Sequence, residues 1–185
     1  MKTSTPTLLG HALLGLLLPG PASGYDLRQI FVRTPMASFS DSPGAIYPAL
    51  ARLEKGGLVT SRVDPSTGLR LRRLYALTEA GRNRLRAWVA QPITREDVVS
   101  DMDGLLLRFA FLDGAGATAR APTFLRELQV TLEAYLSELR AYLAKHGPVT
   151  PLTGRLALEN GLRGYEAHLR WAMRSQASFP AIETP

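Results

Sequence analysis

Side chains that could bind a phosphate backbone gather in residues 42–55 (SPGAIYPALARLEK). Ile46, Leu50 and Leu53 recur there at helical spacing, so the opposite face of the expected helix would carry small and basic residues. Small residues let a helix approach a groove wall closely, and the free N–H groups at its start could hold a phosphate. The candidate contacts with DNA phosphates or base edges are Ser42, Gly44, Ala45, Tyr47, Arg52 and Lys55. The alternative is a plain amphipathic core helix with a solvated basic face.

A second basic group follows a few residues later. Arg70, Arg72 and Arg73 crowd one expected strand, and Arg62 lies on the preceding one. Arginines this close together repel one another unless a polyanion lies nearby, and arginine suits the negative potential of DNA. We therefore predict that Arg70, Arg72 and Arg73 bind DNA. A purely solubilising face is the alternative.

Catalytic groups are sparse by comparison. The chain has no cysteine, and His11, His146 and His168 lack the spacing of metal ligands. Asp101 and Asp103 resemble the aspartate motif of haloacid-dehalogenase-type phosphatases, but they follow a helix opening rather than a buried strand, and no parallel α/β pattern comes after them. We predict no enzyme activity, no cofactor and no metal.

The elements that would position the basic groups are short. Apolar periodicity and breakers predict helices over residues 5–18, 24–32 and 43–55, then hairpin strands over 58–63 and 69–77, then a helix over 79–89. Ser23 and Thr78 are the expected N-caps. Three short helices followed by a hairpin have the layout of a winged helix-turn-helix, in which the hairpin is the wing.

Charge divides the chain at about residue 90. Residues 1–90 hold 12 Lys and Arg against 5 Asp and Glu, whereas residues 91–185 hold 10 against 11. The basic excess therefore belongs to the first half, as expected of a polyanion-binding module joined to something else. The apolar run at residues 8–18 also resembles a secretory signal peptide, although its leucines equally form a helical stripe.

The second half is predicted to be all α-helix. A helix over about residues 97–112 precedes two long amphipathic helices with heptad-like seams, which would form an antiparallel hairpin. Their apolar stripes are wider than a two-helix contact needs, so we expect a second copy of the chain to cover the rest. Packing of these helices onto the first domain is the alternative. The expected dimerisation residues are Leu125, Leu128, Leu132, Tyr135, Leu139, Tyr142, Leu158, Leu162, Tyr165 and Leu169.

Three stretches together resemble the DNA-binding domain of PadR-type transcriptional regulators. They are LLGLLLPGPASGYDL, SPGAIYPALARLEKGGLV and RRLYALTEAGR, within residues 13–86. The second half is similar, more loosely, to the C-terminal domain of the virulence activator AphA through DGLLLRFAFLDG and ALENGLRGYEAHLRWAMR.

The resemblance implies a homodimer that is held by C-terminal helices and binds a pseudo-palindromic operator. It also implies a DNA contact for Tyr25, which matches the family's Gly-Tyr pair, and for many members a small-molecule effector that nothing in this sequence identifies. Leu71 and Leu74 depart from the residues common in the family's wing, which leaves the contacts of the wing open.

The sequence thus predicts a mainly α protein with a small β-hairpin. Residues 1–90 would form a winged helix-turn-helix DNA-binding domain and residues 91–185 an all-α antiparallel-helix dimerisation domain. The expected function is a cytoplasmic, homodimeric transcriptional regulator, a repressor rather than an activator. The runner-up is a winged-helix protein-interaction module that binds no DNA.

Overall fold

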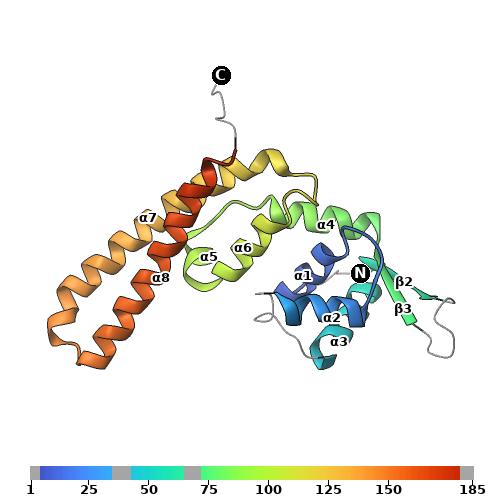
Figure 1. Ribbon diagram of the computed structural model, residues 1–185, viewed down its shortest axis with the longest axis horizontal. Coiled ribbons are helices and arrows are strands. Elements are labelled where there is room, and N and C mark those ends of the chain that lie inside the picture. The colour runs from blue at the N-terminus through green and yellow to red at the C-terminus, as the bar shows by residue number, and fades with distance from the viewer. Residues whose placement is uncertain (1–4, 35–42, 65–71, 180–185) are drawn as a thin grey trace, which may run out of the picture. The chain divides into compact units, whose positions relative to one another are not determined.

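The structure is a computed structural model that describes residues 5–34, 43–64 and 72–179. The predicted class is confirmed: the protein is mainly α-helical with one small antiparallel sheet (Figure 1). The chain forms two compact units, one of Met1–Ala90 with Ala110–Ala117 and one of Gln91–Phe109 with Thr118–Pro185. The short segment 110–117 packs with the first unit, whereas the sequence pattern had indicated the second.

The first unit has the expected order of three helices, a hairpin and a helix. Its elements are α1 (Leu8–Leu16), β1 (Ala22–Ser23), α2 (Gly24–Arg33), α3 (Pro43–Lys55), β2 (Val59–Asp64), β3 (Arg72–Leu77) and α4 (Glu79–Val89). The strand β1 was not predicted; it pairs with β3, which also pairs with β2, and both pairings are antiparallel. A two-residue strand is too short to leave an alternating pattern in the sequence. Figure 1 shows the β2–β3 hairpin beside the helices, as in a winged helix.

The core of this unit draws on all four helices. Leu13 and Leu14 of α1, Phe31 of α2 and Leu50 of α3 have no exposed surface, and neither has Leu85 of α4. The apolar run at residues 8–18, which resembled a signal peptide, therefore supplies part of the core. Burial of such side chains provides the main driving force that holds α3 in place.

Glycine and threonine join the end of α3 to the hairpin and to α4. Gly57 has a φ of 69°, the left-handed conformation that ends many helices, and Leu58 N–H bonds the Leu53 carbonyl at 2.9 Å. Thr78 caps α4 by accepting from Gly81 N–H at 3.0 Å, and its hydroxyl donates to the Gly57 carbonyl at 2.7 Å. A Cβ on Gly81 would lie 2.0 Å from the Leu58 carbonyl oxygen, so only glycine fits there.

A buried histidine connects α1 to α4. The His11 ring stacks on Trp88, with ring centroids 4.3 Å apart and planes at 7°. Burial, assisted by the nearby charge of Arg84 and opposed by a hydrogen bond to the Thr7 backbone, lowers the pKa of His11 from 6.5 to about 4. His11 is therefore neutral in the folded protein at neutral pH.

We expect this histidine to make folding sensitive to acid. Because the folded pKa is below the unfolded one, the stabilisation is complete above pH 6.5 and is lost as pH falls toward 4. Between pH 7 and pH 5 the loss should be about 2 kcal/mol. Urea unfolding at both pH values measures it, with His11→Phe as the comparison because phenylalanine keeps the stack on Trp88 and does not titrate. An equal loss in both proteins would contradict this assignment.

The second unit is built from helices. Its elements are α5 (Arg95–Ser100), α6 (Met102–Ala110, whose last residue belongs to the first unit), η3 (Thr118–Arg120), α7 (Ala121–His146), η4 (Gly147–Val149) and α8 (Leu152–Gln176). The predicted antiparallel hairpin is α7 with α8, joined by η4 (Figure 1). The single helix predicted over residues 97–112 is instead two helices. Asp101 separates them, and its carboxylate caps α6 by accepting from Gly104 N–H at 3.2 Å.

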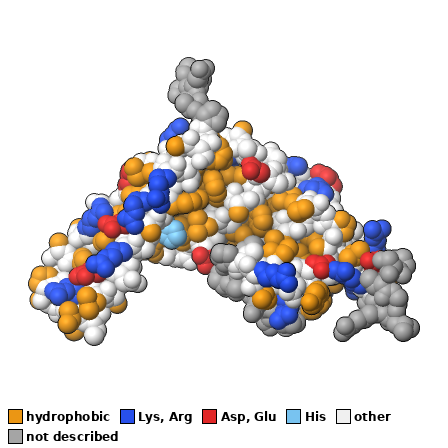
Figure 2. Space-filling view, viewed as in Figure 1, with side chains coloured by type: hydrophobic (Ala, Val, Ile, Leu, Met, Phe, Trp, Pro, Cys, Tyr) orange, Lys and Arg blue, Asp and Glu red, His pale blue; other side chains and the backbone are white. Residues whose placement is uncertain are grey.

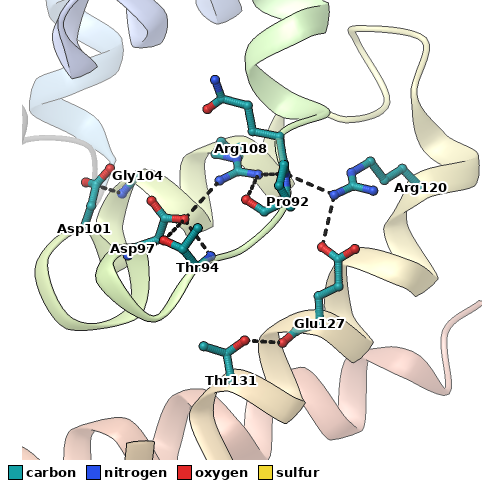
Figure 3. A network of polar contacts seen from close by, with 10 residues as sticks. Pro92, Thr94, Asp97, Asp101, Gly104, Arg108, Arg120, Glu127 and Thr131 are labelled. Carbon is teal, nitrogen blue, oxygen red and sulfur yellow. Dashed lines mark hydrogen bonds and ion pairs between the residues drawn. The ribbon is translucent and has the colours of Figure 1, made fainter.

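Arg108 is the buried polar centre of this unit (Figure 3). Its guanidinium bonds the backbone carbonyl of Gln91, lies 3.4 Å from that of Pro92 and 3.9 Å from the Asp97 carboxylate, and sits over the ring of Phe124. Arg120 donates to the same Gln91 carbonyl at 3.0 Å. Two arginines thus fix the backbone just after α4, and burial lowers the pKa of Arg108 although the charge of Asp97 opposes this.

Among the described residues, no group of histidine and acidic side chains is arranged to hold a metal ion. In the same part of the chain, none of the helices combines the length and the apolar character that a membrane crossing requires. Asp101, half of the phosphatase-like aspartate motif, serves as a helix cap.

Candidate nucleic-acid interface

The outward face of α3 carries the predicted contact residues. Ile46, Ala49, Leu50 and Leu53 are at most 4% exposed, as predicted for the inward face. The opposite face is exposed and consists of Gly44, Tyr47, Pro48, Ala51, Arg52 and Lys55, with Ala45 half-buried beside it. The helix is continuous through Pro48. The outward face of α3 therefore carries small residues at its start and basic residues in its last turn.

Arg52 and Lys55 are cations without an acidic partner among the described residues. Both are exposed and neither forms an ion pair there. They are placed where a helix favours positive charge, near its C-terminal end. Such side chains are free to meet an external anion at no cost in internal contacts. Figure 2 shows Lys and Arg side chains over this part of the first unit.

Tyr47 packs against the start of α2. A Cβ on Gly24 would lie 2.5 Å from the Tyr47 ring, so the glycine at this position lets the ring lie against the backbone. Tyr47 is 48% exposed, and Tyr25, the next residue after Gly24, is 60% exposed. Two tyrosine hydroxyls are therefore available near the start of α2 and the face of α3. Gly24 of the Gly-Tyr pair therefore has a structural reason, the packing of Tyr47, apart from any contact with DNA.

The start of α2 is fixed by a capping box, as predicted for Ser23. Asp26 N–H donates to the Ser23 hydroxyl at 3.2 Å, while Ser23 N–H and hydroxyl donate to the Asp26 carboxylate at 3.1 and 2.9 Å. Partial burial would raise the pKa of Asp26, but these bonds and the guanidinium of Arg72 together lower it. Asp26 is thus a fixed negative charge.

Two of the predicted wing arginines have acidic partners inside the protein. Arg72 at the start of β3 forms an ion pair with Asp26 of α2. Arg73 Nε donates to the Ser61 hydroxyl of β2 at 2.7 Å, and its terminal nitrogen lies 3.8 Å from the Glu54 carboxylate of α3. Ser61 in turn donates to Glu54. The expectation that only a polyanion could balance these arginines is therefore wrong for Arg72 and Arg73.

The other residues predicted to contact DNA differ in what the structure says of them. Ser42 and Arg70 lie outside the described residues. Arg62 of β2 is exposed, faces Leu74 across the hairpin, and has no ion pair among the described residues. Tyr47 lies on α3 itself, Tyr25 lies on α2, and Arg72 and Arg73 lie on β3. Sequence reasoning missed Asp26 and Glu54 as partners of the wing, although the Ser-x-x-Asp spacing of residues 23–26 does indicate the capping box.

The predicted dimerisation residues fall into two groups. Leu125, Leu128 and Leu132 have no exposed surface in a single chain, so their expected role at a dimer interface is wrong. They fill the core of the second unit, where α5 and α8 pack on α7. The other seven keep accessible surface: Tyr135, Leu139, Tyr142, Leu158, Leu162, Tyr165 and Leu169.

The far end of the α7–α8 hairpin exposes apolar side chains. Tyr142 is 52%, Val149 82%, Leu152 60% and Leu156 52% exposed. In Figure 2 hydrophobic side chains mark this end of the hairpin, and a row of basic side chains follows α8. Within the second unit, Tyr135 and Tyr165 meet edge to face at 4.9 Å and Arg140 pairs with Glu166, contacts that hold the two helices together.

Comparison with known proteins finds similarity to one family in the first unit. Residues 13–87 match the model of the transcriptional regulator PadR-like family. The negative transcriptional regulator PadR of Bacillus subtilis is 28% identical over 138 residues, which cover 75% of this chain and 74% of the relative. The probable transcriptional regulator Rv1176c of Mycobacterium tuberculosis is 26% identical, with 88% of this chain and 93% of the relative covered.

The solved structures include a similar chain. The crystal structure of Bacillus subtilis PadR in complex with operator DNA is 25% identical, covers 92% of this chain and 97% of its own, and has a TM-score of 0.44. The matched segment 13–87 contains α2, α3 and the wing, whose sequence carried the resemblance. Over residues 13–87 the chain is therefore similar to the PadR-like family of transcriptional regulators.

Proposed function

We propose that this protein represses transcription as a homodimer that binds a pseudo-palindromic operator. The observation that carries the proposal is the exposed face of α3, where Arg52, Lys55 and Tyr47 stand on a helix fixed by four buried side chains. That face lies within the segment that matches the family. Repression is favoured over activation because one curated relative is named a negative regulator.

On DNA, α3 of each protomer would enter a major groove. The two helices of the dimer would meet half-sites one helical turn apart, about 34 Å. The small side chains of Gly44 and Ala45 would lie close to the groove, and Tyr25, Tyr47, Arg52 and Lys55 would bind phosphates. Ser42 and Arg70 are also proposed to bind DNA. For these two residues the proposal rests on the sequence alone, because they lie outside the described residues. Arg72 and Arg73 would approach DNA with their acidic partners beside them.

Residues 1–90 would serve as the DNA-binding domain and residues 91–185 as the dimerisation domain. A second copy of the chain would cover the exposed apolar surface of the α7–α8 hairpin. We further propose that a small-molecule effector releases the operator. The protein would act in the cytoplasm, where the chromosome is, and would catalyse no reaction. The resemblance of the second half to AphA stays a prediction.

A dimer that forms through the α7–α8 hairpin should dissociate when negative charges are placed on the hairpin surface. Tyr142→Glu with Leu158→Glu should convert dimers of the 20.2 kDa chain to monomers, because both side chains are exposed in one protomer and a buried carboxylate in an interface is costly. Sedimentation velocity measures the mass. Val130→Glu is the control, since Val130 is 59% exposed on α7 outside the predicted set. A wild-type monomer, or a dimer that survives the double substitution, would contradict the proposed interface.

DNA binding itself is tested with two duplexes of equal length, one from the promoter region of the protein's own gene and one of random sequence. Fluorescence anisotropy should show saturable binding to both, tighter to the promoter duplex by at least about a thousandfold. Absence of binding to either would favour the alternative, a winged-helix module that binds other proteins.

A further inference from the structure

The basic surface of the first unit holds two kinds of cation. Arg52, Lys55 and Arg62 are exposed and lack an ion pair among the described residues, whereas Arg72 and Arg73 are each held by an acid. The unpaired cations stand on α3 and β2, and both paired arginines stand on β3. The sequence does not show which of these cations are paired, because all of them carry the same charge. The ion pairs in the structure do show it.

The acids come from the two helices of the helix-turn-helix. Asp26 belongs to the first turn of α2, and Glu54 belongs to the last turn of α3. Arg72 and Arg73 therefore tie the wing to both helices, and Ser61 adds a link from β2. The paired side chains remain partly exposed, at 40% for both Arg72 and Asp26 and at 60% and 32% for Arg73 and Glu54. A phosphate could thus reach the arginines, but only in competition with a carboxylate.

Asp26 stays ionised throughout the neutral pH range and so remains an ion-pair partner for Arg72. The capping box fixes its carboxylate from the other side, through the Ser23 backbone and hydroxyl. Burial opposes but does not prevent the lowering of its pKa by these bonds and by Arg72. Glu54 is likewise fixed on two sides, by Ser61 and by Arg73.

We propose that Asp26 and Glu54 set the strength of DNA binding by shielding the wing arginines from backbone phosphates. The attraction of cations to phosphates is the same for every sequence, so each unshielded arginine strengthens random binding as much as operator binding. A shielded arginine contributes little to that attraction while it still fixes the wing beside α3. The shielding thus lowers the affinity for operator and random DNA by the same factor and leaves base recognition by α3 in place. This role rests on the proposed function, since it concerns DNA bound at the same surface.

The test uses isosteric removal of each negative charge. Glu54→Gln keeps an oxygen that can accept from Ser61, and Asp26→Asn keeps one that can accept from Ser23, so both variants should fold, as thermal unfolding would verify. Each should raise the affinity for a random duplex roughly fivefold at about 100 mM salt and steepen the dependence of log Kd on log salt by about 0.9 for each arginine freed. The affinity for the operator should rise by about the same factor, so the ratio of the two affinities should stay nearly unchanged.

Glu138→Gln is the matched control. Glu138 of α7 pairs with Arg95 at 2.6 Å, and both side chains are more than half exposed, so this change also removes one negative charge and frees one arginine. It should leave the random affinity and its salt dependence close to those of the wild type. If Glu54→Gln and Asp26→Asn behaved like Glu138→Gln, the shielding role would be overturned while the proposed function stood. If the wild type bound no duplex, both would be overturned.

Discussion

Replacing Arg52 and Lys55 together by alanine is expected to weaken binding to operator and random duplexes alike by at least about a hundredfold at about 100 mM salt. Removing one cation from a phosphate should weaken binding roughly tenfold at that salt concentration and should flatten the dependence of log Kd on log salt by about 0.9. Both duplexes should respond because phosphates are the same in every sequence. Neither side chain has an acidic partner among the described residues, so the fold should not change.

The control for that double substitution is Arg126→Ala with Lys145→Ala. These two cations are exposed on α7 and form no ion pair among the described residues, so their removal changes the net charge equally. Anisotropy titrations at several salt concentrations compare the two variants. Equal losses in both would show that overall charge, rather than the face of α3, attracts DNA. A loss on the operator alone would assign Arg52 and Lys55 to base edges instead of phosphates.

Arg108→Ala is expected to lower the free energy of unfolding by about 3 kcal/mol. The side chain is 4% exposed, and its removal leaves a cavity and takes a donor from the Gln91 and Pro92 carbonyls. Asp97 would lose its cationic partner but would keep the capping bonds from Thr94 at 2.8 Å. Loss of one partner from a buried charged pair is strongly destabilising in general. Urea unfolding followed by tryptophan fluorescence measures the change.

Two variants separate the causes of that loss. Arg108→Met keeps most of the volume without the donors, so it should recover only part of the stability. Arg95→Ala removes an arginine whose pair with Glu138 is exposed, and the unfolding midpoint should stay nearly unchanged. A loss in Arg108→Ala no larger than that in Arg95→Ala would contradict the role of Arg108 as the polar centre of the second unit.

Local signals in the sequence were sufficient for much of the first unit. The spacing of Ile46, Leu50 and Leu53 indicated which face of α3 is buried, because helical period and burial are directly linked. Ser23 and Thr78 were found as caps because capping depends on residues three positions apart. The outward residues of α3 followed from the same period, and with them the main candidates for DNA contact.

Contacts between distant residues were beyond such reasoning. Arg72 meets Asp26 across 46 positions, and no local pattern joins them. The seam of α7 correctly indicated a buried face, but periodicity does not say what covers it, and Leu125, Leu128 and Leu132 proved to be covered by the chain's own helices. Likewise, the apolar pattern of residues 97–112 did not reveal that Asp101 would end one helix and cap the next.

The central claim, that α3 reads an operator in duplex DNA, is tested most directly by footprinting. The wild-type chain and the Arg52→Ala, Lys55→Ala variant would be titrated onto the promoter region of the protein's own gene, with hydroxyl-radical cleavage as the readout. We expect one protected region with two-fold symmetry, in which the centres of protection are about 10 base pairs apart, and its loss in the variant at the same protein concentration. Uniform protection along the fragment, or equal protection by both proteins, would contradict this claim.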